Sequence, residues 1–570
     1  MKSNPFSIPA WHRLSALLLA LALFTSPAFG QATAVAPKPA AALSAAETEA
    51  AARVKVETIK EVTAALSAKE MEGRGTAQAG GDRAAKYIAD KFAKLGLKPL
   101  GDAGGSYLQA IKFNSSQPLP ESSFKAGETP LKFGTEFIPA PPYMSDLSEA
   151  SGGLVFVTYG VVSPALKRDD LAGIDVKGKV VVLLSGKPKN VDEALWKQAS
   201  SSQVVAGNLI RSGAAAVVLG NVGSKQQPFS LIGMYLSRRR VALGEAPTAP
   251  FKIPPFILAG DEGMEKLFAG TGMTYSEALT KAQNGETVSR DLNKQATISI
   301  KVKKEMGVGS NVVGVLEGSD PKLKDQAVVY TAHYDAYGID LEGRIFPGAA
   351  DNALGVAEII AMAEAFTKSP TKPKRSIIFL AVTGEEHGLL GAEYWVSHPT
   401  WPLDKVAANL NFDGIGTEVY APVKSVVGFG AEHSDLGALV EGVVTANGGQ
   451  MAPDPLPEEG VFYRSDHFAF VKKGVPALML LGGPAGEVAP WIARAQKWME
   501  TDYHQAGDII RPDWHWDGAR TVAVIGLVTG MRVANTEAMP TWLTTSPFNK
   551  PRGGAPKAAP AATPAATPGN

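Results

Sequence analysis

Short apolar runs alternate with longer amphipathic stretches in the second half of the chain. Residues 352–367 have helical spacing, with Val356, Ile359, Ile360 and Ala363 on one face. Further helices are predicted at 434–447 and 516–535, and apolar runs of strand length occur at 296–303, 327–333, 376–382, 406–412 and 475–481. This alternation predicts an α/β fold with a mixed, mostly parallel sheet sandwiched by helices.

Residues 140–295 have a different pattern. Short β-branched runs, such as 154–158 and 180–184, are separated by Gly, Pro and Asp, which predicts a compact β-rich domain with one or two helices. Residues 81–97 form an amphipathic helix that we expect to pack on the main sheet. The main domain is therefore expected to comprise residues 43–139 and 296–540, with residues 140–295 as an insertion.

Neither end of the chain has the apolar periodicity of a folded domain. Lys2 and Arg13 lie in a short segment that precedes an apolar segment, Leu14 to Phe24, and the small-x-small pattern Ala28-Phe29-Gly30 follows. This predicts a signal peptide over residues 1–30, because the apolar segment is shorter than the ~20 residues of a membrane span. We therefore expect an exported protein, periplasmic or secreted, without stable membrane insertion. The Pro/Ala-rich residues 31–42 and 541–570 predict a disordered linker and a disordered tail.

Composition excludes several classes of function. Lys+Arg and Asp+Glu both number 56, so the net charge is zero and no nucleic-acid partner is indicated. The chain has no cysteine, which excludes disulfides, thiolate zinc sites and a cysteine nucleophile. The sequence does not predict the oligomeric state.

Residues that commonly bind metals recur where the predicted strands end. They are His333 and Asp335, Asp351 at a helix start, Glu385 and Glu386, Asp413, and later His504. In open α/β sheets, ligands bind at the carboxyl ends of the strands. Imidazole and carboxylate without thiolate favour zinc, with manganese or cobalt as alternatives. Two histidines and three carboxylates suit two ions that share one bridging carboxylate.

These motifs resemble the co-catalytic zinc exopeptidases of the bacterial leucyl aminopeptidase and glutamate carboxypeptidase type (peptidase clan MH). The matching stretches keep the family's order from about residue 45 to about residue 540. They are MEGRGTAQAGGDRAAKYIADKFAKLGLKP (71–99), SNVVGVLEGSD (310–320), AHYDAYG (332–338), GAADNALGVAE (348–358), FLAVTGEEHGLLGAEYW (379–395), NLNFDGIG (409–416), RSDHFAF (464–470) and DYHQAGD (502–508).

The resemblance implies a role for each candidate residue. The ligands of two zinc ions would be His333, Asp351, Glu386, Asp413 and His504, with Asp351 bridging. Asp335 would orient His333, Glu385 would be the general base, and Tyr463 lies near the position of a tyrosine that helps to hold the oxyanion. His387, beside the two glutamates, is interpreted as a bystander.

The inserted region resembles a protease-associated (PA) domain. Its landmarks are GLVFVTYG (153–160), DDLAGIDVKGKVVVLLSG (169–186), RSGAAAVVLGN (211–221) and IPPFILA (253–259). In related peptidases such a domain often lines the substrate cleft, whereas its sequence here carries no chemistry of its own.

The resemblance implies an exported di-zinc aminopeptidase that removes N-terminal residues from peptides, with Glu385 activating a water that bridges two zinc ions per chain. A carboxypeptidase or dipeptidase on the same scaffold is the main alternative, for which Arg464 could supply a basic pocket. A glutaminyl cyclase is disfavoured by the complete ligand set and by the insertion. A non-enzymatic, receptor-like binding protein is disfavoured because every ligand and the base are present.

Overall fold

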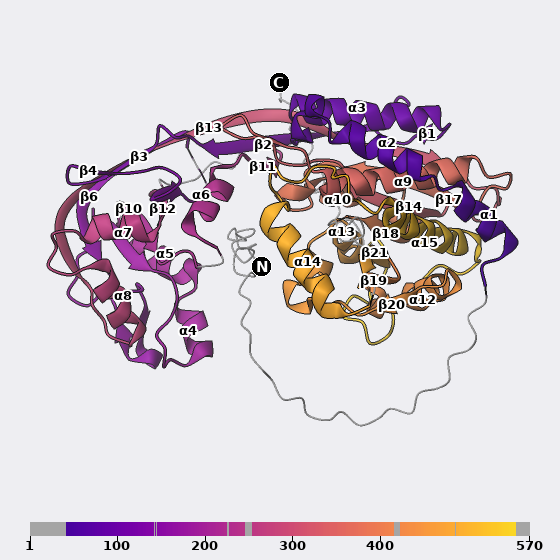
Figure 1. Ribbon diagram of the computed structural model, residues 1–570. Helices are drawn as coiled ribbons and strands as arrows, with labels where there is room; N and C mark the ends of the chain where they lie inside the picture. Colours follow the sequence, from indigo (N-terminus) through magenta and orange to yellow (C-terminus); the bar gives the residue numbers. More distant parts are fainter. Residues whose placement is uncertain are drawn as a thin grey trace, which may run out of the picture. The chain divides into compact units, whose positions relative to one another are not determined.

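The computed structural model describes residues 42–141, 143, 145–224, 227–245, 253–414, 422–484 and 486–553 (Figure 1). These residues form two compact units. One is the inserted unit, Asn114–Met306, and the other is the main unit, made of residues 42–113 and 307–553. The predicted signal peptide and all but the last residue of the predicted linker lie outside the described residues.

The main unit is built on a mixed sheet with the strand order β1–β13–β17–β14–β18–β21–β19–β20. β14, β17, β18 and β21 are parallel to one another, whereas β13 and β19 run antiparallel to β17 and β21. This confirms the predicted sheet. The bounds are β1 (Lys98–Pro99), β13 (Arg290–Leu316), β14 (Ala327–His333), β17 (Ser376–Val382), β18 (Val406–Phe412), β19 (Ser425–Phe429), β20 (Gln450–Ala452) and β21 (Ala477–Gly483).

Alternate side chains of the central strands enter two different cores, as the period of two in a strand requires. In β17, for example, Ile377 and Phe379 join a core with the larger group of helices, while Ile378 and Leu380 join a core with the smaller group. The larger group is α1 (Ala45–Arg53), α2 (Val56–Leu66), α3 (Ala79–Lys94), α9 (Leu354–Thr367), α12 (Leu436–Ala446) and α15 (Trp516–Asn535). The smaller is α10 (Leu390–Ser397) and α13 (His467–Lys472). The sheet is therefore sandwiched by helices, and the expected helix over 81–97 is α3.

The inserted unit has its own sheet and its own core. β6 (Leu147–Phe156), β9 (Val180–Leu184), β10 (Ala216–Gly220) and β12 (Phe256–Ala259) are parallel neighbours. β5 (Phe137–Pro139) pairs with β12, and the first half of β13 pairs with β6 and with β3 (Ser123–Ala126), which pairs with β4 (Thr129–Leu131). Because β3, β4 and β5 belong to this sheet, the unit begins at Asn114 and not at residue 140, and it ends at Met306 and not at residue 295.

The prediction of one or two helices in the insertion is wrong. Its described residues contain α4 (Glu193–Ala199), α5 (Ser202–Arg211), α6 (Phe229–Ser237), α7 (Asp261–Phe268) and α8 (Tyr275–Gln283). These helices are short, so each shows few repeats of the helical pattern. A capping box at the start of α8, formed by Thr274 and Glu277, was a local signal that could have been read.

The last part of the chain corrects a second prediction. Residues 541–553, which were expected to be disordered, form a packed segment that we call the C-terminal strap. The indole Nε1 of Trp542 donates to Gly474 O at 2.9 Å, and Gly553 N donates to Lys473 O at 2.9 Å. Trp542 and Phe548 pack against the core that contains α10 and α13. A tail was predicted here because residues 541–553 were grouped with the Pro/Ala-rich residues that follow them, although this segment contains two aromatic residues and no alanine.

Within the part of the chain that the structure describes, no helix combines the length and the apolar character needed to cross a membrane.

Candidate metal centre

The register of the central strands brings the candidate residues to one edge of the sheet. His333, the last residue of β14, pairs with Val382 at the end of β17. Thr331 pairs with Asn411 of β18, so Asp413, two residues further, lies beside His333. Glu385 and Glu386 follow β17 in the 3₁₀ turn η5 (Glu385–His387). Asp351 lies in η4 (Ala349–Ala353), the irregular turn that leads into α9.

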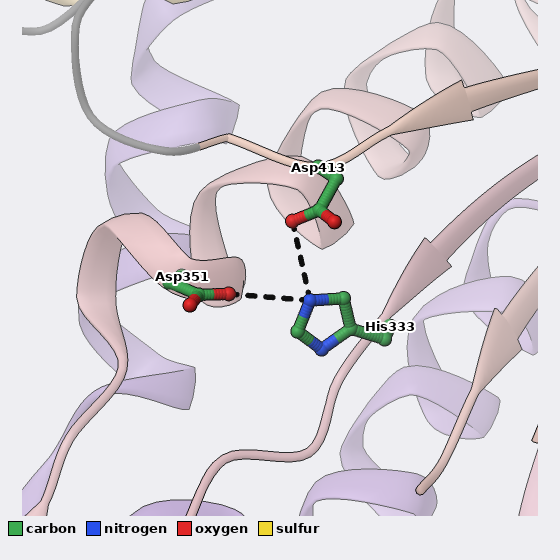
Figure 2. Close-up of side chains that lie close together, drawn as sticks. All are labelled: His333, Asp351 and Asp413. Carbon is green, nitrogen blue, oxygen red and sulfur yellow. Dashed lines mark hydrogen bonds and ion pairs between the residues drawn. The ribbon is translucent and has the colours of Figure 1, made fainter. Parts of the chain in front are cut away.

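One group of three candidate ligands is centred on His333 (Figure 2). The Nε2 atom of His333 lies 3.2 Å from Asp351 Oδ1 and 3.2 Å from Asp413 Oδ1. All three side chains are largely buried, and the His333 side chain is only 1% exposed. An imidazole and two carboxylates that converge in this way can hold a divalent cation.

A second group is centred on His504, which lies beyond α14 (Val488–Thr501). The Nε2 atom of His504 lies 3.3 Å from Asp351 Oδ2 and 3.0 Å from Glu386 Oε2. The two oxygens of Asp351 thus face two different histidines, so this carboxylate belongs to both groups of candidate ligands and could be shared by two cations. The structure brings together all five residues that were predicted as ligands.

Asp335 and Glu385 lie beside the first group. Nδ1 of His333 is 3.2 Å from the Asp335 carbonyl oxygen and 3.7 Å from Asp335 Oδ1, on the ring edge opposite the ligand group. Asp335 is fully buried and accepts hydrogen bonds from Thr76 Oγ1 and from the Glu385 backbone amide. Glu385 Oε2 is 3.9 Å from His333 Nε2, next to the centre but outside both groups of three.

A chain of buried hydrogen bonds supports Asp413, and the sequence did not predict it. Asn409 Nδ2 donates to Thr331 Oγ1 (3.0 Å), Thr331 Oγ1 donates to Asn411 Oδ1 (2.6 Å), Asn411 Nδ2 donates to Ser465 Oγ (2.7 Å), and Ser465 Oγ donates to Asp413 Oδ2 (2.6 Å). We call this the Asp413 relay. One sequence signal for this relay was available: Asn409 and Asn411 occupy alternate positions of an otherwise apolar strand.

Two further residues hold the turn that carries Asp351. Asp508, which is 3% exposed, accepts from the backbone amides of Ala350 at 2.8 Å and of Asp351 at 2.9 Å. The side-chain amide of Asn352 donates from Nδ2 to Phe412 O and accepts at Oδ1 from Gly414 N. These bonds join the turn to the segment that carries Asp413. Both are in motifs that were quoted for the resemblance, but neither was assigned a role.

Other residues near these motifs have different surroundings. The side chain of Tyr463 is half exposed and its ring contacts Phe462 and Phe468. Among the described residues, no hydrogen bond joins its hydroxyl to a candidate ligand, so its role stays a prediction. His387 belongs to neither group of three, and its ring lies edge-on to Tyr337. Arg464 forms an ion pair with Glu459 at 3.5 Å.

The electrostatics of the centre favour cations. Burial, together with Asp413, Asp466 and Glu386, raises the pKa of Glu385 well above its ordinary value, although His333 acts against this. Burial raises the pKa of Asp466 to about 8, with Asp413 adding to the effect. Burial and neighbouring carboxylates oppose the charged forms of these groups, so without a cation they tend to keep their protons. Divalent cations would favour the charged forms, and the imidazole and carboxylate donors fit zinc.

The fold and the donor set are those expected of a zinc peptidase, and comparison with known proteins supports this class. Residues 311–528 match the family described as "Peptidase family M28", which confirms the predicted resemblance. The chain is 28% identical over 258 residues to the "probable leucine aminopeptidase 2" of Aspergillus oryzae, which covers 44% of this chain and 48% of that protein. It is 32% identical over 139 residues to Aminopeptidase YwaD of Bacillus subtilis, covering 24% of this chain and 28% of that protein. The chain thus spans at most about half the length of these relatives.

Solved structures support the fold. An aminopeptidase from Aneurinibacillus sp. strain AM-1 aligns over 87% of this chain and 97% of its own length, with a TM-score of 0.56 and 18% identity. BSAP, a zinc aminopeptidase from Bacillus subtilis, aligns over 85% and 96% with a TM-score of 0.52 and 20% identity. At these identities the likeness establishes the shared fold.

Proposed function

We propose that the protein is an exported di-zinc aminopeptidase. The observation that carries this proposal is the position of Asp351, whose two carboxylate oxygens each face a different group of ligands. One zinc ion would be held by His333, Asp351 and Asp413, and the other by Asp351, Glu386 and His504. The aminopeptidase names of the relatives from Aspergillus oryzae and Bacillus subtilis support the reaction class.

Zinc ions, when bound, lower the pKa of a water and polarise the scissile carbonyl. The chain's own part of the chemistry falls to Glu385, the carboxylate that lies beside the first group without belonging to either group. Glu385 takes a proton from the attacking water and gives it to the amine that leaves. Tyr463 is proposed to donate a hydrogen bond to the developing oxyanion.

The aminopeptidase names of both relatives favour an aminopeptidase over a carboxypeptidase. The basic residue considered for a carboxypeptidase, Arg464, forms an ion pair with Glu459 at 3.5 Å and also interacts with Tyr503 and Glu385. Dipeptides blocked at the N-terminus should therefore be poor substrates, whereas those blocked at the C-terminus should be cleaved. The reverse preference would favour the carboxypeptidase.

The experiment that tests the whole proposal combines metal analysis with a panel of aminoacyl chromogenic substrates. We expect about two zinc ions per chain, release of the N-terminal residue, and loss of activity on chelation. Replacing Tyr463 by Phe is expected to lower kcat by about 100-fold. Activity that survives complete removal of metal would overturn the mechanism.

Export and the nature of the insertion are also proposals. The Leu14 to Phe24 segment and the Ala28-Phe29-Gly30 pattern support cleavage after residue 30, and a mature N-terminus elsewhere in the folded chain would contradict it. The landmarks between residues 153 and 259 support a PA domain in the inserted unit, which has its own core.

A further inference from the structure

The two candidate zinc-binding histidines differ in the partner of their second ring nitrogen, Nδ1. Nδ1 of His333 faces Asp335, through its carbonyl oxygen at 3.2 Å and its carboxylate at 3.7 Å. Nδ1 of His504 instead lies 3.1 Å from the hydroxyl of Tyr337. A metal-binding histidine needs a partner on its second nitrogen, because that hydrogen bond sets which nitrogen carries the proton and how the ring is turned.

His504 depends on such a partner more than His333 does. His333 is the end residue of a central strand and is 1% exposed, whereas His504 follows a helix, has a φ of +58° and has a side chain that is 18% exposed. The backbone therefore fixes the ring of His504 less well. Its faces and edges are held by aromatic rings: Tyr503 stacks on it with centroids 3.6 Å apart, and Tyr337 meets it edge-on at 4.9 Å.

We propose that Tyr337 is the positioning residue of His504. Its hydroxyl oxygen accepts a hydrogen bond from Nδ1–H, which leaves the lone pair of Nε2 directed at the side where Asp351 and Glu386 lie. Tyr503 stacks on the ring but cannot select the tautomer by stacking. This inference rests on the proposed function, because it concerns how one zinc ion is held.

The position of Tyr337 in the chain links the two halves of the centre. Tyr337 lies four residues after His333, and its ring packs edge-on against Phe346 of β16 (Ile345–Phe346). A single segment, 333–337, therefore supplies a ligand to one metal position, the partner of that ligand, and the partner of the histidine at the other position. Tyr337 also lines a small cavity together with Asp351, Glu386, His504 and Asp508.

The test is the variant Tyr337→Phe, which keeps the ring and removes the hydroxyl. We expect the affinity of one zinc ion to fall by roughly 10- to 100-fold, with the other unchanged, as measured by competition with a chromogenic chelator. The matched control is Tyr107→Phe, which removes a hydroxyl that donates to the Leu97 carbonyl in the same unit. The control should release both ions as the wild type does.

A second variant shows which ion is affected. In the background of His504→Ala, where that position is already disabled, Tyr337→Phe should cause no further loss of zinc affinity. Two ions held as tightly in Tyr337→Phe as in the wild type, or a further loss in the double variant, would overturn the role of Tyr337 and leave the proposed function intact. A wild-type protein without zinc would overturn the proposed function itself.

Discussion

The two halves of the candidate metal centre are built by different means. The half around His333 and Asp413 stands on the ends of two parallel central strands and is supported by the Asp413 relay, all of it buried. The half around Glu386 and His504 stands on a 3₁₀ turn and on a loop after a helix, with aromatic rings around the histidine. Strand register positions the first half, and side-chain contacts position the second. Asp351 belongs to both.

The largest expected effect comes from removing the residue that the halves share. In Asp351→Ala both groups of three lose a ligand, so the zinc content should fall from two ions per chain to near zero and activity should be lost with it. Metal analysis after gel filtration measures this. The control is Glu342→Ala, which removes a 71% exposed carboxylate that pairs with Arg344. This variant should keep both ions. Retention of one ion in Asp351→Ala would show that one half can hold metal without the bridge.

The next effect separates chemistry from metal binding. Glu385 belongs to neither half, so Glu385→Gln should lower kcat by about 10²- to 10⁴-fold while the protein keeps its zinc. Rates on an aminoacyl chromogen and metal content are measured on the same sample. An unchanged kcat would remove Glu385 from the mechanism, and a loss of zinc would assign it to a metal position.

A smaller effect tests the support of the strand-built half. Ser465→Ala removes the donor to Asp413 Oδ2 and ends the Asp413 relay before it reaches the ligand. We expect the affinity of one zinc ion to fall by roughly 10- to 100-fold. This should be a different ion from the one weakened by Tyr337→Phe, so the double variant should show both losses added. If both variants loosen the same ion, the division into two independent halves is wrong.

A last effect concerns the half around Glu386 and His504 in the metal-free protein. Burial opposes a proton on His504, but Glu386 and Asp351 outweigh it and raise its pKa from 6.5 to about 9. The stability that this proton contributes is complete below pH 6.5 and is lost as the pH rises through 9. The raised pKa of Asp508, about 7, acts in the same direction at lower pH.

The proton on His504 alone should contribute on the order of 3 kcal/mol of unfolding free energy, which the metal-free protein loses between about pH 6 and about pH 9. Zinc ligands bind in their deprotonated forms, so the stabilisation by added zinc should grow over the same range. Denaturant unfolding with and without zinc measures both. A metal-free protein that becomes more stable towards pH 9 would contradict the environment described for His504.

The sequence predicted the strands and the ligands of the half around His333 and Asp413 better than it predicted the residues that hold those ligands in place. The bounds of β14, β17, β18 and α15 agree with the predicted ranges because uninterrupted buried runs give an unambiguous pattern. The ligands follow from strand ends and from the resemblance. Ser465, Asp508 and Tyr337 act across 52, 157 and 167 positions of the sequence, so only the folded chain brings them to their partners. The helices of the insertion and the packed strap were missed because tertiary contacts stabilise segments whose local pattern is weak.

The C-terminal strap has a practical consequence for any shortened form of this protein. The match to peptidase family M28 ends at residue 528, inside α15 and before the strap. Phe548 lies against Phe462 and Phe468, whose rings also contact Tyr463. A chain that ends at residue 528 would lack the strap, so these rings would form an exposed apolar patch and we expect the protein to aggregate. A chain that ends at residue 553 would keep the strap over these rings, and we expect it not to aggregate through them.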